Sequence, residues 1–123
     1  MIGRLYTSVF PFYDNKMHKM SYKSRPVLIV GQADQNDYAV LPVSRVTNQN
    51  NLDNYYDVLL EPADYPLANL TQKSYVRTHK QYTIHKGELV KDIVDFRHVY
   101  SDTYLDIIIK MEEFQKNLIS KAI

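Results

Sequence analysis

The chain has no cysteine, few glycines and no long apolar run, and each absence excludes a class of protein. Without cysteine there is neither a disulfide framework nor a thiolate metal site, which favours a reducing compartment. The N-terminal residues lack the apolar stretch of a signal peptide, and no segment approaches the roughly 20 apolar residues that span a bilayer. Only three glycines occur, with no internal repeat or flexible linker. We therefore predict a cytoplasmic protein that does not enter the membrane, with a single domain over residues 1–123.

The net charge of +1 hides an uneven distribution of charged residues. Residues 1–25 carry five cations against Asp14 alone, and residues 73–86 carry four Lys or Arg and two His with no acid. Residues 46–72, in contrast, carry four acids and neither Lys nor Arg. Two basic blocks on a nearly neutral body would attract a polyanion locally. The alternative is that both blocks are ordinary solvated surface.

Short apolar segments followed by one amphipathic segment predict strands and then a helix. We expect strands over residues 5–10, 26–30, 38–43, 55–60 and 75–83, of which 26–30 is apolar enough to be buried on both faces. Residues 11–24 indicate a long polar loop, because Asp14-Asn15-Lys16 is a turn signal. Residues 47–54 indicate an Asn-rich loop, residues 61–74 a connection with one helical turn, and residues 85–90 a short helix or a return strand.

The C-terminal segment predicts a long helix capped by Ser101. Its apolar residues recur near helical spacing at Tyr104, Ile108, Met111, Phe114 and Leu118, widened by Leu105, Ile107 and Ile109. Such a stripe indicates packing against a sheet, and a dimer seam is the alternative. This order of elements predicts an α+β, mainly β fold: a small, strongly bent β-barrel with a long C-terminal helix.

Arg25 stands directly before Pro26 and the β-branched run that follows. Proline forces the preceding residue into an extended conformation and donates no hydrogen bond to a ladder, so this pair marks the start of a strand. Arg25 would then project from the rim, where its planar guanidinium suits a phosphate. A surface salt bridge is the ordinary alternative.

Ser44 ends the predicted strand 38–43 and offers a hydroxyl that can donate to a phosphate oxygen. A hydroxyl that merely satisfies a turn is the alternative. No Ser, His and Asp stand at a spacing that indicates a serine hydrolase. The four histidines are scattered, so we predict no metal site and no cofactor.

Residues 23–30, 39–45 and 74–84, in this order and spacing, resemble the MazF/PemK family of toxin endoribonucleases. The resemblance covers roughly residues 3–120. It implies an SH3-like barrel, a homodimer, and a cognate antitoxin with an acidic, flexible segment. It also implies metal-independent cleavage of single-stranded RNA, in which the ribose 2′-OH attacks the adjacent phosphorus and leaves a 2′,3′-cyclic phosphate and a 5′-OH. Arg25 and Ser44 would be the catalytic residues.

Basic and aromatic side chains near these segments are expected to contact the RNA. Tyr22 would stack on a base. His79 and Lys80 stand where better-known members carry an acid and an amide, a departure that still suits a phosphate channel. His79 as an acid or base, or as an incidental histidine, stays open. The expected RNA-binding residues are Lys16, Lys19, Tyr22, Lys23, Arg45, Arg77, His79 and Lys80.

Two other functions stay open beside the endoribonuclease. One is a non-catalytic binding module on the same fold, like the gyrase-poisoning relatives of the family. The other is a basic regulator that binds nucleic acid. The presence of both Arg25 and Ser44 favours the enzyme.

Overall fold

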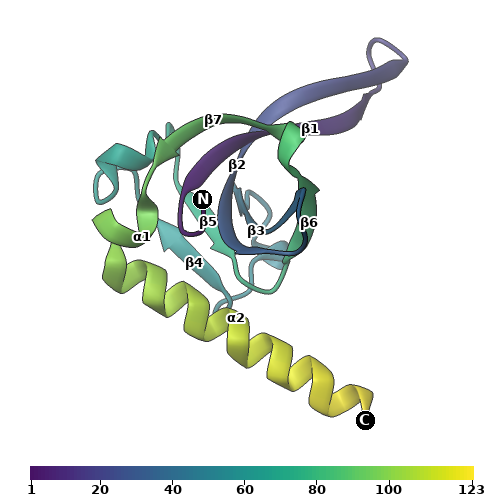
Figure 1. Ribbon diagram of the computed structural model, residues 1–123. Helices are drawn as coiled ribbons and strands as arrows, with labels where there is room; N and C mark the ends of the chain where they lie inside the picture. The colour runs from purple at the N-terminus through teal and green to yellow at the C-terminus, as the bar shows by residue number, and fades with distance from the viewer.

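A curled antiparallel sheet forms the body of the protein, and one long helix packs against it (Figure 1). The computed structural model describes all of residues 1–123. The order of the strands in the sheet is β4-β5-β3-β2-β1-β7, with β6 also paired to β3. The strands are β1 (Leu5–Asp14), β2 (Lys19–Gln32), β3 (Asp37–Ser44), β4 (Asp57–Leu60), β5 (Ser74–Arg77), β6 (Tyr82–His85) and β7 (Leu89–Val94). The helices are α1 (Phe96–Val99) and α2 (Ser101–Ala122), with short 3-10 turns η1 (Gln49–Asn51), η2 (Pro66–Ala68) and η3 (Lys86–Glu88).

The mainly β, α+β class with a small curled barrel and a C-terminal helix is confirmed. The helical turn expected in the connection 61–74 is η2. The segment 75–83 contains two short strands, β5 and β6, because the turn at residues 78–81 interrupts it. The alternatives for residues 85–90 are both partly right, since η3 leads directly into β7.

Strand β3 is the branch point of the sheet. Its first half pairs with β6, and its last two residues pair with β5. On its other edge it pairs with β2 as far as Val27 opposite Pro42. Beyond this pair, residues 25–26 of β2 and residues 43–44 of β3 lie at the rim of the sheet. There β2 pairs only with β1, and β3 pairs with β5.

Alternate residues of β2 enter two different apolar cores. Leu28 belongs to the larger core, together with Leu41 and Phe96. Val27 and Ile29 belong to a smaller core on the other face. Because successive side chains of a strand point to opposite faces, both faces of this segment are covered. The burial on both faces expected for residues 26–30 is confirmed over residues 27–29.

Helix α2 contacts the sheet through a narrower stripe than the sequence predicts. Ile107 is fully buried in the larger core, whereas Leu105, Ile109 and Leu118 are exposed. The expected cap at Ser101 is wrong: Tyr100 occupies the capping position and its side chain makes no capping hydrogen bond. The chain is already helical in α1, so Ser101 does not begin an isolated helix. Neither helix combines the length and the apolar character needed to cross a membrane.

The expected loop over residues 11–24 is wrong. These residues form the outer part of a long hairpin of β1 and β2, which projects from the barrel as an arm (Figure 1). The pairing is regular from Phe10 opposite Lys23 to Asp14 opposite Lys19. Asp14 closes the tip by accepting hydrogen bonds from the backbone amides of Lys16 and Met17. Asp14-Asn15-Lys16 does mark a turn, but the turn is a tight one that joins two strands and not part of a long loop.

Candidate functional site

A cleft of about 710 Å³ lies at the rim where β2 and β3 take different neighbours. Its walls come from β2, from the end of β3 with the following loop, and from the connection between β4 and β5. No carboxylate or imidazole lines it, and many of its other polar groups are hydroxyls and amides. A concave site whose only charged side chains are positive attracts an anion. The four lining cations are Lys23, Arg25, Arg45 and Arg77, and the lining amides are Asn48, Asn51, Asn69 and Gln72.

Arg25 and Ser44 come together because their strands are neighbours. Each lies two residues beyond the Val27–Pro42 pair, on the same face as that pair, and both line the cleft. The backbone carbonyl of Arg25 accepts a hydrogen bond of 2.9 Å from the buried hydroxyl of Ser8. This bond fixes the backbone that carries the guanidinium.

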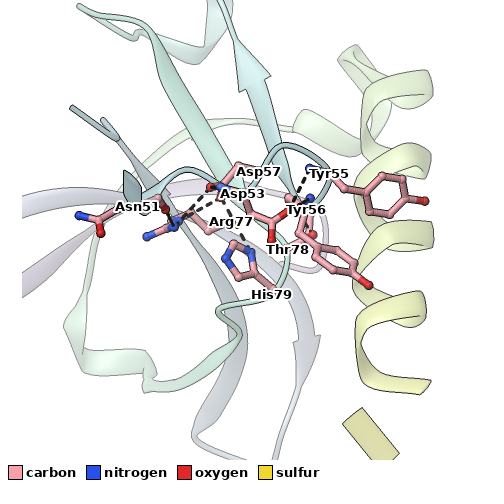
Figure 2. Close-up of polar contacts among 8 residues, drawn as sticks. All are labelled: Asn51, Asp53, Tyr55, Tyr56, Asp57, Arg77, Thr78 and His79. Atoms are coloured by element: carbon pink, nitrogen blue, oxygen red, sulfur yellow. Dashed lines mark hydrogen bonds and ion pairs between the residues drawn. The ribbon is translucent and has the colours of Figure 1, made fainter. Parts of the chain in front are cut away.

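Arg77 is fixed by a buried carboxylate (Figure 2). Its Nε lies 3.0 Å from Asp57 Oδ1, and its Nη2 lies 3.3 Å from Asp57 Oδ2. Nη2 also donates to the backbone carbonyl of Asn51 at 2.7 Å. The Asp57 side chain is 0% exposed, and that of Arg77 is 19% exposed. Arg77 therefore reaches the cleft in one orientation, with much of its charge compensated by Asp57.

The loop before β4 is held by a second aspartate. Asp53 Oδ1 accepts hydrogen bonds from the backbone amides of Tyr55 and Tyr56. The amides of Tyr56 and Tyr55 lower the pKa of this carboxyl. The buried Thr78 hydroxyl donates to the carbonyl of Tyr56 at 2.7 Å. These bonds tie the loop to the end of β5, next to the Asp57–Arg77 pair.

His79 does not line the cleft, and its ring lies near the Asp57 carboxylate (Figure 2). Its Nδ1 lies 3.9 Å from Asp57 Oδ1 and makes no hydrogen bond. The ring packs beside Tyr56 and beside Phe114 of α2. Burial lowers the pKa of His79, although the charge of Asp57 opposes that shift. The imidazole is therefore neutral near pH 7 and is covered by α2.

The structure brings together only some of the residues that the sequence singles out. Arg25, Ser44, Lys23, Arg45 and Arg77 all line the cleft. Five others do not, and their contact with RNA stays a prediction: Lys16 and Lys19 at the tip of the arm, Tyr22 farther along it, and His79 and Lys80 after β5.

Tyr22 is 68% exposed, on the face of the arm opposite to Arg25. The sequence did not single out Asp57, the amides of the cleft, or Phe10, whose ring centre lies 4.1 Å from Arg25 Cζ. The Asn-rich composition of residues 47–54 was the one signal, and it covers only Asn48 and Asn51 of the four amides. No cluster of three or more His, Cys, Asp or Glu side chains is placed to hold a metal ion.

Residues 6–109 match the family described as PemK-like, MazF-like toxin of type II toxin-antitoxin system. The match covers most of the chain. The chain belongs to this family. The matched region of this PemK-like protein runs from β1 into α2 and includes every residue that lines the cleft. No curated protein sequence matched the chain closely enough to count as a relative.

Proposed function

We propose that this PemK-like toxin cleaves single-stranded RNA in the cleft between β2 and β3. The observation that carries the proposal is the composition of the cleft: four cations, no carboxylate, and Arg25 beside Ser44 on one face. A single RNA strand is a flexible polyanion, and phosphate contacts from Lys and Arg supply most of the affinity for such a ligand. The side-chain amides of the cleft, from the loop after β3 and from the connection between β4 and β5, offer donors and acceptors for base edges.

The proposed reaction is a transesterification within the RNA. The ribose 2′-oxygen forms a bond to the adjacent phosphorus and gives up its proton, and the bond from phosphorus to the 5′-oxygen breaks as that oxygen takes up a proton. The products are a 2′,3′-cyclic phosphate and a 5′-OH. The Arg25 guanidinium stabilises the charged phosphorane, and the Ser44 hydroxyl donates to a non-bridging oxygen. Fixed donors of this kind stabilise a transition state without a metal ion.

End-labelled single-stranded RNA incubated with the protein in EDTA tests the proposal. We expect short products with a cyclic phosphate end, and no cleavage of DNA of the same sequence, which lacks the 2′-OH. Arg25→Ala should lower the rate by about 100- to 1,000-fold, the usual effect of losing one such donor. Lys121→Ala, an exposed cation at the end of α2, is the matched control and should cleave like the wild type.

A non-catalytic binding module is the second candidate. It is favoured by the absence of any imidazole or carboxylate in the cleft that would accept the proton of the 2′-OH. Intact RNA from a folded sample, bound in a salt-dependent manner, would support this module and refute the nuclease. Growth inhibition that persists in Arg25→Ala would point the same way.

A cognate antitoxin with an acidic, flexible segment is the proposed partner. The cleft supports this partner because the same cations that attract phosphates attract carboxylates. We also propose a homodimer, for which the exposed Leu105 and Ile109 on α2 provide apolar surface. Co-expression with a small protein that carries an acidic, flexible segment and is encoded next to this chain should relieve growth inhibition. Light scattering should give twice the mass of one chain.

A further inference from the structure

An aromatic ring, rather than a carboxylate, supports the guanidinium of Arg25. Its Cζ lies 4.1 Å from the centre of the Phe10 ring. The register explains this contact: Ser8 is opposite Arg25 and Phe10 is opposite Lys23, so Phe10 and Arg25 are diagonal neighbours on one face. None of the ion pairs of the chain includes Arg25.

Arg25 and Arg77, two of the three arginines of the cleft, are thus held by different means. The carboxylate of Asp57 occupies two donors of Arg77 and compensates its charge. Stacking on Phe10 supports Arg25 from one side through the quadrupole of the ring. The donors of a guanidinium lie in its own plane, and no hydrogen bond or ion pair within the chain engages those of Arg25, so all five donors and the whole charge are available. Free donors and an uncompensated charge suit a guanidinium to a phosphate.

Phe10 has little part in the packing of the barrel. It belongs to neither apolar core. It lies beyond Ser8, the last residue of β1 that pairs with β7. The ammonium of Lys23 also approaches this ring, at 5.8 Å, and approaches Phe12 at 5.2 Å. The ring therefore contacts the cations at the edge of the cleft and is not part of either core.

We propose that Phe10 is a positioning residue that holds the Arg25 guanidinium where it meets the scissile phosphate. This inference rests on the proposed function, which makes phosphate the anion of the cleft. Phe10 acts through Arg25.

The first test concerns the free protein and does not depend on cleavage. The ring current of Phe10 should shift the NMR signals of the Arg25 side chain upfield. Phe10→Leu should abolish that shift, and Phe10→Tyr should keep it. Phe12→Leu is the matched control, because it removes a ring that contacts Lys23 and not Arg25. Arg25 signals at random-coil positions in the wild type would overturn the proposal.

The second test concerns the reaction. Phe10→Leu should lower kcat/KM about tenfold, the effect of losing one stacked cation contact. Phe10→Tyr should restore the rate. Phe10→Leu should weaken the binding of a 2′-deoxy oligonucleotide when Arg25 is present, and it should have no effect on this binding in the Arg25→Ala background. Equal losses in both backgrounds would overturn the proposal. RNA left intact by the wild type would refute the nuclease, and the Arg25 signals with the binding comparison would still decide the role of Phe10.

Discussion

The Asp57–Arg77 ion pair allows a quantitative prediction about the stability of this PemK-like toxin. We expect Asp57→Asn to lower the free energy of unfolding by about 3 kcal/mol. The substitution removes the charge from an acceptor that receives hydrogen bonds from Arg77 at 3.0 and 3.3 Å and from the Asp53 amide at 2.9 Å. Loss of one partner from a buried pair costs about 3–5 kcal/mol. The lower end applies because Arg77 is 19% exposed and water reaches it.

The double variant gives the stricter form of this prediction. Arg77→Met leaves the Asp57 carboxylate, which is 0% exposed, without its main cation, so it should cost at least as much as Asp57→Asn. Asp57→Asn with Arg77→Met removes both charges at once. In each single variant, most of the lost free energy of unfolding comes from the charge that is left without its partner. The double variant should therefore be more stable than the sum of the two single losses predicts.

Urea unfolding measures these changes as shifts of the midpoint at constant m-value. For a chain of this size, a loss of about 3 kcal/mol also lowers Tm by roughly 10–15 °C. Lys116→Met is the matched control, because it breaks an exposed pair with Glu112 at 2.9 Å and should change stability by less than about 0.5 kcal/mol. Equal effects of Asp57→Asn and Lys116→Met would refute the reasoning from burial.

Four further outcomes are expected. Ser44→Ala should lower kcat about 100-fold, and Ser44→Thr should restore it, as measured on labelled RNA. Because burial lowers the pKa of His79 below the usual 6.5, the unfolded chain binds more protons there, so stability should fall as pH drops below 6.5 and should fall less in His79→Gln. Gly3→Ala should lower stability by about 2 kcal/mol in urea unfolding, since Gly3 has a φ of +89° and a Cβ would lie 2.4 Å from Arg97 Cβ. In a salt titration of binding to single-stranded RNA, replacing Lys16 and Lys19 by Ala should make the slope shallower by about 1.4, and an unchanged slope would place the arm tip outside the RNA path.

The sequence was sufficient for the parts of the fold that depend on local pattern. The apolar run after Pro26 predicts a strand buried on both faces, and the C-terminal stripe predicts a helix on the core. The arm was missed because its residues alternate without burial: two strands that project from a barrel have no apolar face to mark them. Pro11 strengthened the error, although it lies where β1 no longer pairs with β7 and an edge tolerates proline.

Only those residues of the site that lie at the ends of predicted strands could be predicted from the sequence. Arg25 and Ser44 each follow or precede an apolar strand, and the meeting of those strand ends follows from their adjacency in the sheet. The place of His79 could not be foreseen, because it depends on the turn after β5 and on the cover that α2 provides. The support of Arg25 by Phe10 depends on the register of β1 and β2. This register cannot be deduced when residues 11–24 are interpreted as a loop.

The distribution of acids explains how a chain of net charge +1 presents a strongly basic cleft. Asp57 is buried behind Arg77, Asp53 closes the loop before β4, and Asp14 closes the tip of the arm. Each of these carboxylates is engaged in a local contact, and none of them lines the cleft. The field that an entering phosphate meets is therefore set by the few cations close to it, because water and salt screen charges farther away than about 10 Å. It follows that, within the cleft, the salt dependence of RNA binding should depend on Lys23, Arg25 and Arg45, to which Lys16 and Lys19 of the arm add where the RNA reaches them. The net charge should not set it, and Arg77, whose charge Asp57 compensates, should contribute least.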